Sequence, residues 1–201
     1  MDGNDAKKQV GSPYRIRLCT ADDIDVLVTT IRSAFGTVAE RLGLNEQNCP
    51  THASNCTAEW IRKDTARGIR YFALESEGRV AGSVALEQVR PGLCNLERLA
   101  VLPQQRRRGY GEALVEHVLS EAATLRCRDV RIGIIASEIE LKEWYRKLGF
   151  VEVETRDIAR LPFRVTFMIQ TLGGPVAQGS QRNGGSGAAS QDKHNLPEED
   201  D

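Results

Sequence analysis

The amino-acid sequence predicts a mixed α/β fold in one domain. Segments in which polar and apolar residues alternate, the period of a strand, are interleaved with segments in which apolar residues recur every three to four positions, the period of a helix. The expected order of elements is β-α-α-β-β-β-α-β-α-β-β. Polar segments at both ends leave about 160 residues between them, enough to enclose one hydrophobic core.

The domain boundaries follow from changes in composition along the 201 residues. Residues 173–201 contain six glycines, and their two basic and five acidic side chains leave a net charge of −3. Such a segment buries too little apolar surface to offset the entropy lost on ordering, so we expect a disordered, Gly/Ser-rich acidic tail. Residues 1–12 are polar and are expected to be flexible. The folded domain is therefore expected over residues 13–172.

The overall composition excludes several classes of protein. The net charge of −1 provides no global field for nucleic acid or an anionic membrane. The longest apolar runs fall far short of the ~20 residues that a membrane-spanning helix needs, and the N-terminal residues lack the apolar core of a signal peptide. An odd number of scattered cysteines favours reduced thiols in a cytoplasmic protein. These cysteines are Cys19, Cys49, Cys56, Cys94 and Cys127.

The first third of the domain reads as one strand and two helices. Residues 14–19 alternate between apolar and polar, which predicts a half-buried strand. Thr20 is suited to cap a helix over residues 21–41, and Gly43 is suited to end it. Residues 45–56 have the composition of a loop. A second helix, over the ten residues AEWIRKDTAR, is expected to begin after the capping residue Thr57 and to end at a glycine.

The centre of the domain is expected to form three consecutive strands. Residues 70–75 and 79–89 flank Ser-Glu-Gly and predict a hairpin. Residues 93–102 form the third strand, which Pro103 ends. The remaining elements are a helix over 112–124, a β-branched strand over 129–136, an amphipathic helix over 138–148 and two closing strands over 150–154 and 163–172.

A basic, glycine-bearing turn joins the third of these strands to the following helix. Residues 103–111 read Pro-Gln-Gln-Arg-Arg-Arg-Gly-Tyr-Gly. Glycines at such a place let backbone N–H groups converge at a helix N-terminus, where the helix dipole favours a phosphate. The turn is neither a Walker A loop nor a dinucleotide fingerprint, because the required Gly-Lys-Ser/Thr and third glycine are missing. A solvated surface loop and a nucleic-acid patch are the alternatives.

Two motifs resemble those of the GNAT N-acetyltransferase superfamily. Residues 99–111, in which Leu-Ala-Val and a proline precede the pattern Arg-x-x-Gly-x-Gly, resemble its acetyl-CoA-binding segment. Residues 145–150, Tyr-Arg-Lys-Leu-Gly-Phe, resemble its Tyr-x-x-x-Gly-Phe signature. The order of elements also agrees, so the resemblance covers residues 14–172.

The resemblance implies a mostly antiparallel sheet that splays open after the strand ending at Val101, with the pantetheine arm of acetyl-CoA in the cleft. Backbone atoms of residues 99–101 would hold the arm and the thioester carbonyl, and amides of residues 107–112 would hold the pyrophosphate. The implied acetyl-CoA-binding residues are Leu99, Ala100, Val101, Arg106, Arg107, Arg108, Gly109, Tyr110, Gly111 and Glu112.

Acetyl transfer to an amine requires a base for the amine, a donor for the developing oxyanion and a proton for the leaving thiolate. The resemblance implies that Tyr145 is the acid; a tyrosine packed at a helix–sheet seam is the alternative. The resemblance also implies that Glu97 is the base, because many relatives carry a glutamate on the strand before the glycine loop; a buried carboxylate there would have a raised pKa suited to that role. The alternative is that Glu97 points to solvent or pairs with an arginine, and Glu87 is a second candidate base.

The sequence departs from one branch of the superfamily. Ribosomal-protein alanine acetyltransferases carry a catalytic glutamate where this chain has Gly133, and an asparagine where it has Glu138. These departures weaken an N-terminal alanine acetyltransferase interpretation and keep open a non-catalytic acyl-CoA-binding sensor of the same fold.

The loop before the second helix contains Cys49, His52 and Cys56. Structural zinc needs four ligands and no fourth stands nearby, so we expect no metal. In this fold the segment borders the acceptor site, so His52 is a candidate to orient the substrate or to act as a base.

We therefore expect an acetyl-CoA-dependent N-acetyltransferase that moves an acetyl group directly to a primary amine of a small molecule or peptide. We expect no nucleic-acid partner, because the arginines at 106–108 lack the wider basic stripe and interleaved aromatic residues of such surfaces. A monomer and a homodimer are both compatible with the sequence, and the acceptor amine is left open.

Overall fold

The computed structural model describes residues 14–173, so residues 1–13 and 174–201, and with them the expected flexible N-terminus and most of the expected tail, lie outside the described residues. The order of elements in the described part is the expected one. The strands are β1 (Tyr14–Leu18), β2 (Arg70–Ser76), β3 (Arg79–Arg90), β4 (Leu93–Val101), β5 (Asp129–Ile135), β6 (Val151–Asp157) and β7 (Arg164–Thr171). The α-helices are α1 (Ile24–Leu42), α2 (Ala58–Ala66), α3 (Tyr110–Thr124) and α4 (Ile139–Lys147).

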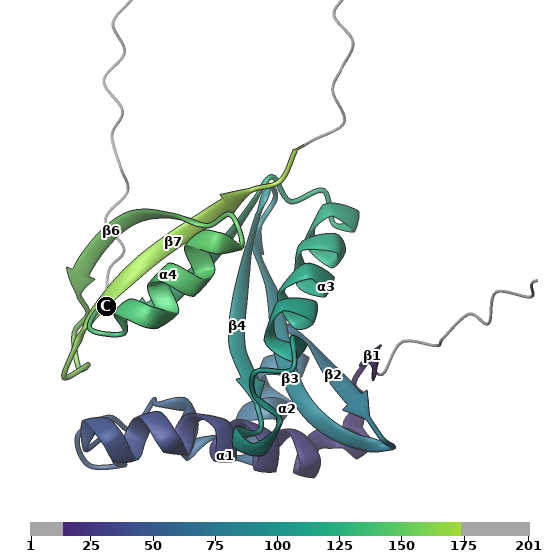
Figure 1. Cartoon of the computed structure of the whole chain (residues 1–201), viewed down its shortest axis with the longest axis horizontal. Coiled ribbons are helices and arrows are strands. Elements are labelled where there is room, and N and C mark those ends of the chain that lie inside the picture. Colours follow the sequence, from purple (N-terminus) through teal and green to yellow (C-terminus); the bar gives the residue numbers. More distant parts are fainter. Residues whose placement is uncertain (1–13, 174–201) are drawn as a thin grey trace, which may run out of the picture.

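The strands form a seven-stranded sheet in the order β1-β2-β3-β4-β5-β7-β6. All neighbouring strands are antiparallel except β4 and β5, which are parallel. Their pairing covers only residues 93–95 of β4 and 129–131 of β5, after which the two strands separate. Figure 1 shows the resulting split, with β6, β7 and α4 on one side and β4, β3 and α3 on the other. The expectation of a splayed, mostly antiparallel sheet is confirmed.

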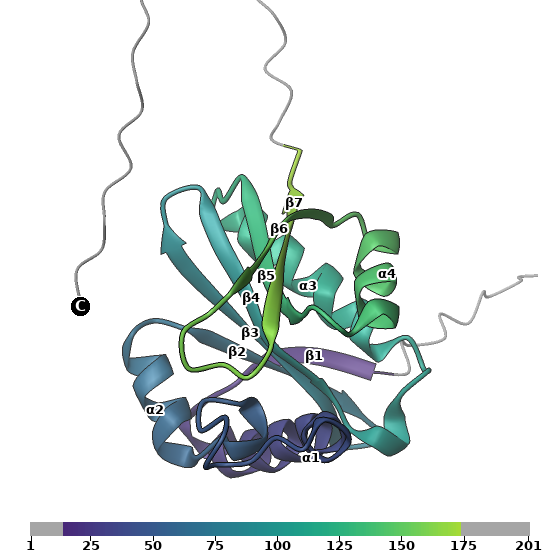
Figure 2. The ribbon, with the colours of Figure 1, turned by 90° about the vertical axis from the view of Figure 1, so that its left-hand side faces the viewer.

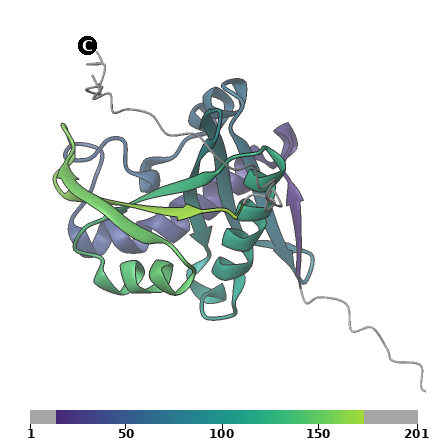
Figure 3. The ribbon, with the colours of Figure 1, turned by 90° about the horizontal axis from the view of Figure 1, so that it is seen from above.

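Two hydrophobic cores cover the two faces of the sheet. Ile31 of α1 and Ile61 of α2 pack with Tyr71 and Ala85 on one face. On the other face, the apolar side of α3 packs against β2 to β5, and Tyr145 at the end of α4 joins the same core. Figure 2 shows α1 and α2 together on one side of the sheet. Seen from above, the β6–β7 pair and α4 extend away from the side that carries β1 (Figure 3).

The helix boundaries follow from the capping residues. The Thr57 side chain accepts a hydrogen bond from the Trp60 N–H at 3.2 Å, and Gly43 ends α1 in the left-handed region with a φ of 64°. Helix α3 begins at Tyr110, two residues earlier than expected, because Gly109 takes the N-cap position with a φ of 79°. The helix N-terminus therefore lies directly against the basic turn.

The expectation of five reduced thiols is wrong for two cysteines. The Sγ atoms of Cys94 and Cys127 form a disulfide, while Cys19, Cys49 and Cys56 are free. Cys94 lies at the start of β4 and Cys127 just before β5, so the parallel pairing of these strands brings their Cα atoms to 6.1 Å. Spacing along the sequence could not reveal this, because the two residues are 33 positions apart.

Candidate active site

A cleft of about 540 Å³ opens where β4 and β5 separate. Its walls come from α1, the loop at residues 49–53, β4, β5, α4 and β7. Three predicted site residues line it together: Glu97 of β4, His52 of the loop and Tyr145 of α4. Leu99, the first residue expected to hold the pantetheine arm, also lines it. The fold thus brings residues that are far apart in the sequence to one concave surface.

A β-bulge interrupts β4 beside this cleft. Glu97 is paired with Ala85 of β3 and Ala100 with Ser83, so β4 has one residue more than β3 over this stretch. Arg98 has a φ of 48°, a left-handed conformation that is uncommon for a residue other than glycine. Because the pairing with β5 ends at Asn95, the backbone beyond it has an open side toward the cleft.

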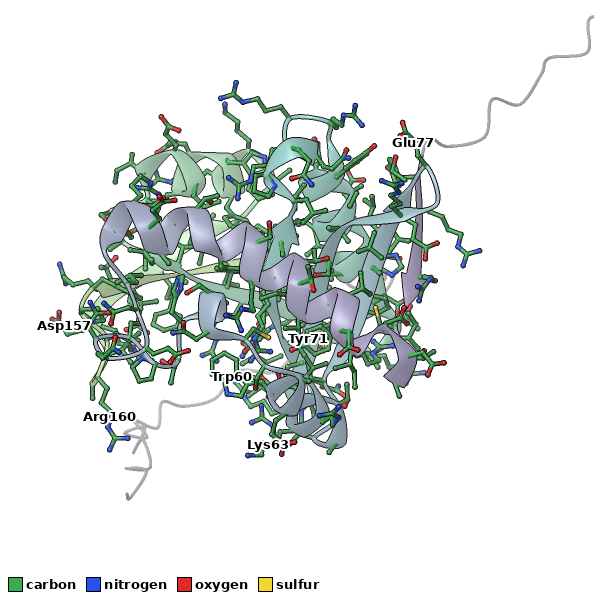
Figure 4. The ribbon with its side chains drawn as sticks, turned by 90° about the horizontal axis from the view of Figure 1, so that it is seen from below. Trp60, Lys63, Tyr71, Glu77, Asp157 and Arg160 are labelled. Atoms are coloured by element: carbon green, nitrogen blue, oxygen red, sulfur yellow. A yellow bond between two sulfur atoms is a disulfide. The ribbon has the colours of Figure 1, made fainter. Side chains whose placement is uncertain are left out.

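The side chain of Arg98 is held by two buried groups. Its Nη1 lies 2.5 Å from both Asp64 Oδ2 and the Tyr71 hydroxyl, and that hydroxyl donates to Asp64 at 2.7 Å. The Arg98 guanidinium also lies 5.9 Å from the Trp60 ring centre. Figure 4 shows Trp60 and Tyr71 on the face of the sheet that α1 and α2 cover. This arrangement compensates the charge of Arg98 and holds the bulge in its left-handed conformation.

Glu97 lies in the cleft with about a third of its side chain exposed (32%). Burial raises its pKa, and the neighbouring carboxyls of Glu87 and Asp64 raise it further. Arg98, whose Nη1 is 3.6 Å from Glu97 Oε2, acts in the opposite direction. The net effect is a carboxyl group whose pKa is above the ordinary value of a glutamate.

Tyr145 packs in the core and also lines the cleft. Its ring packs against Trp144 and Phe150 with centroid distances of 4.8 and 5.3 Å. Among the described residues, no group forms a hydrogen bond with its hydroxyl, and burial raises the pKa of the phenol. Tyr145 is therefore both a packed residue and a neutral donor at the wall of the cleft.

His52 is buried at the opposite wall. Its Nδ1 accepts a hydrogen bond from the Ser54 N–H at 3.3 Å and lies 2.8 Å from the Ser54 hydroxyl. Burial lowers the pKa of the imidazole, so the neutral ring is favoured. Cys49 and Cys56 are fully buried nearby. No cluster of His, Cys, Asp or Glu within residues 14–173 is arranged to hold a metal ion.

The basic turn presents a row of free backbone donors. Arg107 and Gly109 have positive φ angles of 62° and 79°. Within the described part of the chain, the N–H groups of residues 107–112 have no hydrogen-bond acceptor; the first bonded amide is that of Ala113. Six consecutive donors without acceptors at a helix N-terminus are an arrangement that favours an anion.

The side chains of the turn differ in their roles. Arg106 donates to the Ala34 carbonyl at 2.8 Å and to the Thr37 hydroxyl at 3.0 Å, which ties the turn to α1. The side chain of Arg108 donates to Gln105, and that of Tyr110 is buried with its hydroxyl 2.8 Å from Ser76 Oγ. Only backbone atoms of Tyr110 can therefore reach a ligand.

The two positions at which the sequence departs from the alanine acetyltransferases are occupied by structural contacts. A Cβ on Gly133 would lie 3.3 Å from Val165 and 3.4 Å from Phe167, so β7 packs closely there. Glu138 forms an ion pair with Arg41 at 2.6 Å. Sequence reasoning missed Asp64, Tyr71 and Arg98, because only the fold brings them together. No helix among residues 14–173 is long and apolar enough to cross a membrane.

The split sheet, with helices on both faces, defines a mixed α/β fold. The chain belongs to the acetyltransferase (GNAT) family, whose model matches residues 39–150. No curated protein matches it in sequence.

Solved structures share the fold at low sequence identity. The PaiA N-acetyltransferase of Thermoplasma acidophilum, solved with coenzyme A, is 16% identical with a TM-score of 0.67, and the match covers 80% of this chain and 100% of that one. The structure of yncA of Salmonella typhimurium, solved with acetyl-CoA, is 18% identical with a TM-score of 0.61, and the match covers 85% of this chain and 100% of that one. A ribosomal-protein-alanine N-acetyltransferase of Brucella melitensis is 21% identical with a TM-score of 0.61, and the match covers 79% of this chain and 99% of that one.

Proposed function

We propose that this protein is an acetyl-CoA-dependent N-acetyltransferase that transfers an acetyl group directly to a primary amine. The observation that carries the proposal is the cleft in which Glu97, Tyr145 and the open backbone of the β4 bulge face one space. A base, an acid and an oxyanion donor are the three groups that the transfer requires. The family to which the chain belongs supports acyl transfer as the reaction class.

The turn at residues 106–112 is the proposed site for the pyrophosphate of acetyl-CoA. The six free N–H groups provide the donors, and the dipole of α3 favours the negative charge. The Arg106 side chain would position the turn, because its guanidinium is already bonded to α1. Backbone atoms of Leu99, Ala100 and Val101 would hold the pantetheine arm along the open side of β4. Bound acetyl-CoA supplies the activated acyl group.

Glu97 and Tyr145 divide the proton transfers between them. Glu97 accepts the amine proton, and its raised pKa brings its basicity closer to that of the group it must deprotonate. Tyr145 donates its proton to the leaving thiolate. Burial keeps this phenol protonated until a stronger base forms beside it. The N–H groups of the bulge at Arg98 and Leu99 would stabilise the oxyanion.

His52 is proposed to orient the acceptor rather than to act as a base. A neutral imidazole that accepts a hydrogen bond at Nδ1 carries its proton on Nε2. In this tautomer Nε2 is a donor and has no lone pair available for an amine proton. A hydrogen bond from Nε2 to the acceptor is the contribution that fits the geometry.

A thiol-release assay tests the proposal. Purified protein is incubated with acetyl-CoA and separate pools of amino acids, polyamines, aminoglycosides and peptides. We expect thiol release that depends on at least one pool, together with an acetylated product of matching mass. Tight acetyl-CoA binding without release in any pool would instead identify a sensor of the same fold.

A further inference from the structure

Arg131 is an arginine of the cleft wall that has no acidic partner among the described residues. Its Nε donates to Asn95 Oδ1 at 3.0 Å, and its guanidinium lies 5.7 Å from the Phe167 ring centre. Within residues 14–173, no carboxylate lies within 4.0 Å of it and its terminal nitrogens Nη1 and Nη2 make no hydrogen bond. Arg98, the other arginine lining the cleft, has Asp64 and Glu97 as partners. The described residues thus leave the charge of Arg131 uncompensated in the cleft.

The orientation of Arg131 is constrained. Asn95 is held in turn by its own amide, which donates to Glu87 Oε2 at 3.3 Å. The Nε hydrogen bond and the Phe167 ring fix the plane of the guanidinium and leave the two terminal nitrogens free. Such a planar pair of donors matches the two oxygens of a carboxylate. The group is therefore prepared for a bidentate anionic ligand.

Arg131 and Glu97 lie on the same face of the sheet, on either side of the split. Asn95 is the register partner of Arg131, and Glu97 lies two residues further along β4. With strands about 4.8 Å apart and a rise of about 3.3 Å per residue, continued pairing would place the two Cα atoms about 8 Å apart, and the split widens this distance. Long side chains from these positions can reach the two ends of one small molecule. The cleft thus combines a carboxylate for an ammonium group with a guanidinium for a carboxylate.

We propose that the acceptor is a free amino acid, whose carboxylate binds Arg131 while its amine is presented to Glu97. This inference rests on the proposed N-acetyltransferase function and names the acceptor class for the same site. Most of the other side chains that line the cleft are apolar, which favours an amino acid with an uncharged side chain. The apolar lining residues are Phe35, Leu141, Leu161, Phe163 and Phe167.

The charges of the cleft disfavour two other acceptors. A polyamine would bring a second cation toward Arg131, which repels it. A peptide N-terminus has an amide where a free amino acid has its carboxylate, so it would leave Arg131 without a partner in a partly buried site. Preferred acetylation of either acceptor is one of the possible results of the test.

The test compares amino acids with their amides. kcat/KM is measured by thiol release at saturating acetyl-CoA for leucine, methionine and phenylalanine and for the amide of each. We expect the wild-type protein to favour an acid over its amide, and Arg131→Met to reduce this acid-to-amide ratio about 10- to 100-fold. Arg131→Lys should restore part of the ratio. The acid-to-amide ratio is compared between wild type and variant at one pH, so the difference in basicity between the amine of the acid and that of the amide cancels.

A matched control uses the other arginine at the same ring. Arg156 lies 4.8 Å from the Phe167 ring centre but belongs to β6 and does not line the cleft. Arg156→Met should leave the acid-to-amide ratio unchanged. Retained acetylation of the amide and unchanged acetyl-CoA affinity show that Arg131→Met is folded.

The outcomes separate the two proposals. If no amine of any class is acetylated, the proposed function fails. If amines are acetylated but Arg131→Met lowers the rates of acid and amide equally, Arg131 is structural and the inference is wrong. Preferred acetylation of polyamines or peptides over free amino acids overturns it as well.

Discussion

Tyr145 is enclosed on its apolar side by Trp144 and Phe150, and its hydroxyl has no hydrogen-bond partner among the described residues. Its proton matters only as the C–S bond breaks, after acetyl-CoA is bound. We therefore predict that Tyr145→Phe lowers kcat about 10²- to 10⁴-fold, the usual contribution of one positioned acid, and leaves acetyl-CoA affinity nearly unchanged. Steady-state kinetics and calorimetry measure the two quantities. Tyr14→Phe, in edge strand β1, is the control. Wild-type kcat in Tyr145→Phe would mean that the residue only packs.

Glu97 carries a pKa above its ordinary value, chiefly because of burial. The wild-type rate should fall as pH falls through this raised pKa, since the protonated carboxyl cannot accept the amine proton. We predict that the rate defect of Glu97→Gln is largest near neutral pH. The defect should shrink as the pH approaches the pKa of the amine, because the amine then loses its proton to solvent without help from the protein. A pH–rate profile measures this. An unchanged profile would move the base to Glu87.

The same pKa shift determines the sign of the effect of Glu97→Gln on stability. A carboxyl whose pKa is higher in the folded than in the unfolded protein binds its proton more tightly when folded. Its contribution is therefore most favourable at low pH and is lost as pH rises from the ordinary pKa through the raised one. Glutamine does not ionise, so the variant should melt at the same temperature as the wild type or higher at pH 8. A large fall in Tm would indicate a structural role.

At the scale of elements, the turn before α3 depends on the backbone of Gly109. A Cβ there meets no atom within 4 Å, so the constraint is its φ of 79°. We predict that Gly109→Val abolishes acetyl-CoA binding, because leaving the left-handed region redirects the N–H groups of residues 107–112. Calorimetry measures the affinity. Gly92→Val, at a turn with a φ of 83° and equally open space, should lose comparable stability and retain binding.

The sequence predicted the elements whose causes are local. Alternation along β1, the cap at Thr57 and the glycines of the basic turn each act within a few residues, so patterns reveal them. The bulge at Arg98 had no such sign, because its left-handed conformation is held by Asp64 and Tyr71 from other elements. The motifs at residues 99–111 and 145–150 predicted that a cleft would form, but the side chains that hold the bulge beside it come together only through long-range packing.

At the scale of the whole molecule, the contacts that the sequence left unpredicted are those across the split. The pairing of Arg131 with Asn95 and the disulfide of Cys94 with Cys127 both depend on the short parallel register of β4 and β5. That register joins two strands that helix α3 separates along the chain, and no local sequence pattern specifies which of their residues pair. The proposed carboxylate-binding residue Arg131 is therefore the part of the site that needed a structure.

The two halves of the sheet share only three register pairs, so a ligand lying between β4 and β5 should stabilise the whole domain. Coenzyme A at 100 times its Kd should add about 2.7 kcal/mol to the free energy of unfolding, which corresponds to a rise in Tm of about 5–11 °C for a domain of this size. Thermal melts measure the rise, and Gly109→Val should not show it. Hydrogen exchange should slow most at residues 96–101 and 132–135, which face the split, because ligand suppresses both local opening and global unfolding there. Between β1 and β2, exchange should slow only for amides that exchange through global unfolding. Protection that is largest between β1 and β2 would place the ligand outside the split.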